Sequence, residues 1–96
     1  MRQAFIVTYD VSDSKRLRKV FRIMKGAGAH LQLSVFRCEL TASQVVVLRD
    51  KLGRAIHAGE DQVLFIDIGP VDGRGRMSIE SLGRAYIPAD DSPVVV

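Results

Sequence analysis

The sequence has 96 residues, of which 47% are hydrophobic and 26% are charged, and its formal net charge is +3. This length allows one modest core, so we expect residues 1–96 to form a single domain. No apolar run approaches the ~20 residues of a membrane-spanning helix, and the N-terminal segment lacks the cleavage pattern of a signal peptide. The single cysteine, Cys38, excludes an internal disulfide. We therefore expect a cytoplasmic protein without a membrane partner.

The first two predicted elements are a strand and a basic helix. Residues 3–9 are rich in β-branched and aromatic side chains, which favours a strand that ends at Asp10. The segment "VSDS" then offers three helix-capping side chains, and a helix of roughly residues 14–26 is expected after it. Its apolar residues recur at the spacing of one helical face, which consists of Leu17, Val20, Phe21 and Met24.

The next elements are predicted to be a strand, a helix and another strand. Residues 30–40 alternate in polarity and indicate a second strand. Thr41 and Gln44 have the spacing of a capping box, and the helix that they begin runs to about His57. Its buried stripe is expected to consist of Val45, Leu48, Leu52 and Ile56. Residues 62–69 indicate a third strand, and residues 84–96 leave room for a further strand in the tail.

This order of elements predicts the fold class. A single sheet with both helices on one face is the simplest way to bury the apolar residues of such a chain. We therefore expect an α+β sandwich of the ferredoxin-like βαββαβ type, with an antiparallel sheet and an extra C-terminal strand that takes part in a dimer.

The alternation of side chains along each predicted strand divides the sheet into two faces. One set is expected to face the helices: Phe5, Val7 and Tyr9, then Leu31, Leu33 and Val35, then Leu64, Ile66 and Ile68. The other face carries polar groups and also large side chains that are expected at a homodimer interface: Ile6, Phe36, Val63 and Phe65. The apolar tail is expected to shelter in the same dimer by adding a strand, with Val94 and Val95 in the interface.

Asp10 is the candidate metal ligand. In a two-fold dimer through the open sheet face, Asp10 would lie near the same residue of the partner subunit. Two such carboxylates repel each other unless a cation lies between them, and Mg²⁺ prefers hard oxygen ligands of this kind. The alternative from position alone is an aspartate that hydrogen-bonds the turn "DVSD".

Basic side chains without acidic neighbours form the candidate nucleic-acid site. No acidic residue occurs from Ser14 to Cys38, and one broad face of the first helix is cationic. Such a face binds phosphates with little sequence preference, although a solvated helix face is the alternative. The candidate contacts are Lys15, Arg16, Arg18, Lys19 and Arg22. Arg74 and Arg76 either extend this surface or belong to a flexible polar loop.

The segments "TYDVSD", "KRLRKV" and "GAHLQLSVFRCEL" resemble the second of the two core CRISPR adaptation proteins, the "Cas two" family. The resemblance rests on Tyr9, Asp10, Arg16, Arg18, Gln32, Ser34, Val35 and Phe36, and the closing "PVVV" is similar to the family's C-terminal strand. It implies a homodimer that works with the "Cas one" integrase in spacer acquisition. It also implies a metal-dependent endonuclease on RNA or double-stranded DNA, with Asp10 of both subunits as the catalytic Mg²⁺ ligand. His30 and Arg37 depart from the family pattern.

Two other functions compete with a nuclease. The first is a non-catalytic DNA-binding scaffold of the same adaptation complex. The second is a ferredoxin-like RNA-recognition or small-ligand regulatory domain, which is disfavoured because no aromatic motif for stacking RNA bases occurs.

Overall fold

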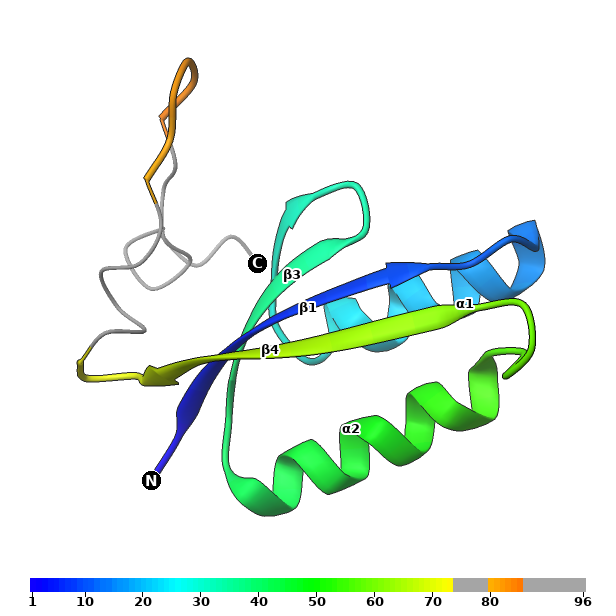
Figure 1. Cartoon of the computed structure of the whole chain (residues 1–96), viewed down its shortest axis with the longest axis horizontal. Helices are drawn as coiled ribbons and strands as arrows, with labels where there is room; N and C mark the ends of the chain where they lie inside the picture. The colour runs from blue at the N-terminus through cyan, green and yellow to red at the C-terminus, as the bar shows by residue number, and fades with distance from the viewer. Residues whose placement is uncertain (74–79, 86–96) are drawn as a thin grey trace.

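The computed structural model describes residues 1–73 and 80–85, which form one antiparallel sheet with helices packed against it (Figure 1). In these residues the elements in chain order are β1 (Gln3–Asp10), α1 (Ser14–Lys25), β2 (Ala29–Gln32), β3 (Val35–Leu40), α2 (Ala42–Ala55) and β4 (Gln62–Pro70). The strand order in the sheet is β2-β3-β1-β4, and every neighbouring pair is antiparallel. The predicted α+β, ferredoxin-like βαββαβ fold is confirmed.

The segment that was predicted as one strand over residues 30–40 is a hairpin. It consists of β2 and β3, which pair with each other and turn at Leu33 and Ser34. Leu33 adopts a φ of 27°, in the left-handed region that favours glycine, and its side chain is 89% exposed. The His30 ring donates a hydrogen bond from Nε2 to the Leu33 carbonyl at 2.7 Å, which supports this turn. Because the turn contains no glycine or asparagine, the sequence carries no turn signal.

The hairpin reverses the predicted faces of β3. Phe36 is fully buried, so its assignment to the open face was wrong. The turn changes the alternation of the segment, and Phe36, Cys38 and Leu40 all point into the core. The Phe36 ring lies 6.2 Å from the Tyr9 ring in a stacked arrangement. Cys38 is a buried thiol, and burial raises its pKa to about 11.

The predicted faces of β4 are also reversed. Val63 and Phe65 pack against the core, whereas Leu64 and Ile66 are 44% and 46% exposed. The register sets this orientation, because Val63 lies opposite the core residue Tyr9. Both alternating sets of β4 are apolar, so the sequence alone does not identify the buried one.

The helices complete the core largely as predicted. In α1, Val20 and Met24 are fully buried, but Leu17 is 40% exposed and does not join the buried stripe. In α2, Leu48 and Leu52 are buried, and the predicted capping box of Thr41 and Gln44 is present. Neither helix of the described part of the chain has the length and apolar character of a membrane span.

Some sequence predictions lie outside the described residues. They concern Arg74 and Arg76 in the basic loop, and Val94 and Val95 in the tail. The basic extension and the added C-terminal strand therefore stay predictions.

Candidate metal and nucleic-acid site

Asp10 is the last residue of β1, where it pairs with Gln62 at the start of β4. The alternation of β1 puts Val7 and Tyr9 into the core, so Asp10 shares the open face with Ile6 and Thr8. Its side chain is exposed, and it makes no hydrogen bond or ion pair with any residue that the structure describes. Asp10 is therefore a strand-end carboxylate that the described fold does not use.

The turn after Asp10 is held by other aspartates. Asp13 caps α1, because its Oδ2 accepts the backbone N–H of Arg16 at 3.0 Å. This hydrogen bond lowers the pKa of Asp13. Asp61 accepts the backbone N–H of Ser12 at 3.1 Å through Oδ1. The turn-capping role considered for Asp10 is thus performed by Asp13, one of the three predicted helix caps, and by Asp61, which the sequence did not indicate.

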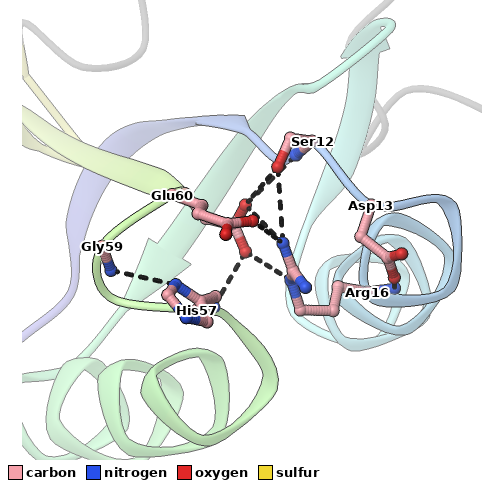
Figure 2. A network of polar contacts seen from close by, with 7 residues as sticks. Ser12, Asp13, Arg16, His57, Gly59 and Glu60 are labelled. Atoms are coloured by element: carbon pink, nitrogen blue, oxygen red, sulfur yellow. Dashed lines mark hydrogen bonds and ion pairs between the residues drawn. The ribbon is translucent and has the colours of Figure 1, made fainter.

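Asp61 lies at the centre of a polar network that joins the N-terminus of α1 to the loop before β4. Figure 2 shows its neighbours Ser12, Arg16, His57 and Glu60 converging on one point. The Asp61 side chain has no exposed surface, and its Oδ2 accepts Arg16 Nε at 2.7 Å and the His57 N–H at 2.8 Å. Arg16 Nη2 completes a fork to Asp61 Oδ1 at 3.2 Å. This network is the main feature of the site that sequence reasoning missed.

The network shifts the pKa values of both partners of the ion pair. The hydrogen bond from Arg16 lowers the pKa of Asp61 far below its usual range, and the same bond raises the pKa of Arg16. Both groups are therefore charged at neutral pH. The only sequence signal was the acidic pair "ED" just before the third predicted strand, and nothing in it identified Arg16 as the partner.

The basic residues of α1 fall into two groups. Arg16 is committed to Asp61 and also contacts Glu60 at 3.2 Å, with 26% of its side chain exposed. The remaining candidate contacts are exposed and form no ion pair with the described acidic residues: Lys15, Arg18, Lys19 and Arg22. They are available for phosphates, whereas the proposed phosphate contact of Arg16 stays a prediction.

No group of three or more His, Cys, Asp and Glu side chains that could hold a metal occurs among residues 1–73 and 80–85. The exposed Asp10 carboxylate has the hard oxygen donors that suit Mg²⁺, but it supplies only part of a coordination shell. The other ligands would have to come from water, from a nucleic-acid phosphate or from a second copy of the chain.

The open sheet face beside Asp10 carries large apolar side chains of β1 and β4. Ile6 lies opposite Ile66, and Thr8 lies opposite Leu64. Of the four predicted interface side chains in this part of the chain, Ile6 lies on this face, and Phe36, Val63 and Phe65 do not. Leu64 and Ile66 take their place in an exposed apolar surface, which supports a subunit interface.

The comparisons with known proteins decide the family. A model of the family described as CRISPR associated protein Cas2 matches residues 3–72, which is more than half of the chain. This chain belongs to the Cas2 family. The matched span contains Asp10, the basic face of α1 and both members of the Arg16–Asp61 ion pair.

Individual relatives agree with this assignment. A Rhodospirillum rubrum protein named CRISPR-associated endoribonuclease Cas2 1 is 37% identical over 97% of this chain and 90% of its own length. Its Geobacter sulfurreducens counterpart, named CRISPR-associated endoribonuclease Cas2, is 32% identical over the full length of both chains. Among solved structures, Streptococcus pyogenes Cas2 has a TM-score of 0.70 and 29% identity over 83% of this chain and 99% of that one. A hypothetical protein from Thermus thermophilus has a TM-score of 0.76 and 31% identity over 92% and 99% of the two chains. The Cas2 fold therefore extends over most of the described chain.

Proposed function

We propose that this Cas2 family protein is a homodimeric, Mg²⁺-dependent endoribonuclease of a CRISPR adaptation system. The observation that carries the proposal is Asp10: an exposed strand-end carboxylate that the described fold leaves unused, close in sequence to a cationic helix. The relatives named as endoribonucleases support RNA as the substrate. Double-stranded DNA is the second substrate to test, because a cationic face without base-reading groups does not distinguish the two.

In the proposed site, Asp10 of each protomer would hold the Mg²⁺ through its carboxylate. When bound, this metal would lower the pKa of a water molecule and stabilise charge on the scissile phosphate. The two protomers supply the acidic ligands, since no described residue near Asp10 completes a metal site within one chain. The exposed basic side chains of α1 hold the flanking phosphates, which fixes the nucleic acid against the strand end.

A scaffold role in the same complex is the second candidate. It is supported by the four exposed basic side chains of α1, because contacts to phosphates position a nucleic acid without catalysing a reaction. In this role the homodimer holds duplex DNA while the partner, the "Cas one" integrase, performs the reaction. Asp10 would then be dispensable for spacer acquisition.

One experiment separates the two roles. Purified protein is incubated with labelled RNA and with duplex DNA, with Mg²⁺ or with EDTA, beside Asp10→Asn and the control Asp72→Asn. Asp72 is an exposed aspartate beyond the end of β4, at the opposite end of the sheet from Asp10, so its variant loses the same charge at a distance. If the nuclease proposal is right, cleavage depends on Mg²⁺, disappears in Asp10→Asn and persists in Asp72→Asn. Cleavage that persists in Asp10→Asn contradicts the proposed site. Spacer integration that survives in this variant favours the scaffold role.

A further inference from the structure

Asp61 contacts the turn that follows Asp10 and directly precedes the residue that pairs with Asp10. Its Oδ1 accepts the N–H of Ser12, two residues after Asp10. The next residue in the chain is Gln62, which pairs with Asp10 across β1 and β4. The buried carboxylate thus holds the turn after Asp10, and its own backbone leads into the strand that pairs with Asp10.

The surroundings of Asp61 favour a fixed position for this carboxylate. It has no exposed surface, and its hydrogen bonds come from two backbone amides, from the Ser12 hydroxyl and from a guanidinium fork. A charge-assisted fork of this kind is directional as well as strong. The side chain of Val11, between Asp10 and Ser12, is also part of the core. The backbone on the C-terminal side of Asp10 is thus held at two successive residues.

We propose that Asp61, held by Arg16, is the positioning residue that orients Asp10 for metal binding. This inference rests on the proposed function of Asp10 as a metal ligand. Metal sites need their ligands within a narrow range of geometry, and side chains that orient the ligands contribute to affinity without touching the metal. Arg16 then acts through Asp61 and is not a contact for nucleic-acid phosphates.

The test measures Mn²⁺ binding by electron paramagnetic resonance, so that its main readout does not depend on cleavage. Asp61→Asn places an amide nitrogen in the site, and in either orientation one backbone amide and one guanidinium N–H then lose their acceptor. We expect this variant to bind Mn²⁺ at least about 10-fold more weakly. Glu60→Gln is the matched control, because it removes the same charge from the neighbouring residue, contacts the same guanidinium and holds no backbone amide. It should keep the affinity of the wild type.

Two further variants separate positioning from general loss of structure. Leu48→Ala removes a buried side chain of α2 outside the network, so it lowers the melting temperature while Mn²⁺ affinity stays unchanged. Arg16→Lys keeps the positive charge but loses the fork, and the amides of Ser12 and His57 keep their acceptors. It should weaken Mn²⁺ binding as Asp61→Asn does, without changing the salt dependence of RNA binding. It also serves as the test if Asp61→Asn does not fold.

The outcomes distinguish this inference from the proposed function. If Asp10→Asn binds Mn²⁺ like the wild type, the proposed metal site itself is wrong. If Asp10→Asn loses Mn²⁺ but Asp61→Asn and Arg16→Lys keep it, only the positioning inference is overturned. A fall in the salt slope of RNA binding in Arg16→Gln, with unchanged Mn²⁺ affinity, would instead assign Arg16 to the phosphates.

Discussion

Ile6 of β1 and Ile66 of β4 lie directly opposite each other on the sheet face that points away from the helices. Thr8 and Leu64 form the next pair on the same face. Leu64 and Ile66 are each more than two-fifths exposed, which is unusual for two large aliphatic side chains side by side in a sheet. A second copy of the chain, related by a two-fold axis, would cover this surface and bring two Asp10 residues together.

The first prediction concerns this surface. Ile66→Asp should convert the proposed homodimer to a monomer, because it would place a charge in the proposed apolar interface. Light scattering at micromolar concentration measures the change. Val46→Asp is the control, since Val46 of α2 is 67% exposed and lies on a helix, away from the sheet face. A monomeric wild type, or a dimeric Ile66→Asp, would contradict the assignment, and deletion of residues 94–96 should weaken the same dimer.

The second prediction concerns nucleic-acid binding. Replacing Arg18 and Arg22 by Gln should flatten the dependence of affinity on salt. On duplex DNA the logarithmic slope should fall by about 0.9 for each phosphate that the variant no longer neutralises. Binding isotherms at several salt concentrations give the slope. The pair Arg49→Gln and Arg54→Gln on α2 removes the same charge and should leave the slope nearly unchanged. An equal effect of both pairs would show that net charge matters and that the α1 face does not.

The third prediction follows from the corrected position of Phe36. Phe36→Ala should lower the free energy of unfolding by roughly 3–5 kcal/mol, because it removes a fully buried aromatic side chain. Urea denaturation measures this loss. Leu33→Ala, in the same hairpin at an exposed position, should change stability little. If Phe36 were an interface residue, its substitution would instead weaken the dimer and leave the subunit nearly as stable.

The fourth prediction concerns pH. The pKa of Asp61 is lowered in the folded protein by its hydrogen bond with Arg16, so its stabilising effect is present above the ordinary pKa of the unfolded chain. This contribution is lost as the pH falls below about 5. Melting temperatures from neutral to acidic pH should therefore fall more steeply for the wild type than for Asp61→Asn. Asp72→Asn should keep the wild-type slope, and an equal slope in all three proteins would argue against a charged Asp61.

The sequence predicted the fold well where the residue pattern fits only one kind of secondary structure. The strand that ends at Asp10, the capping box of α2 and the ferredoxin-like arrangement all follow from periodicity and caps. The faces of β3 and β4 were wrong for two physical reasons. For β3, the turn depends on a positive φ at Leu33, which is not expected of a leucine. For β4, both alternating sets of side chains are apolar, so only the register with β1 decides which set is buried.

The candidate site was predictable in part for a related reason. Asp10 and the cationic face of α1 are local features, and a sequence reading can find them. The pair of Arg16 and Asp61 joins residues 45 positions apart, and neither residue has a local signal for the other. Its discovery required the structure, because only the pairing of β4 with β1 brings Asp61 beneath the N-terminus of α1.

That long-range pair also sets an order of events in folding. A nascent chain that ends before residue 61 already contains Asp10, Arg16 and the hairpin of β2 and β3, but not the carboxylate that holds the turn after Asp10. Contacts between distant residues carry a larger loop-closure entropy than local ones, so β4 is expected to dock after the local elements. The turn beyond Asp10 thus reaches its final geometry only when the last described strand is in place. If Asp10 is the proposed metal ligand, the site forms only after β4 has been synthesised and has folded, and incomplete chains carry its residues without its arrangement.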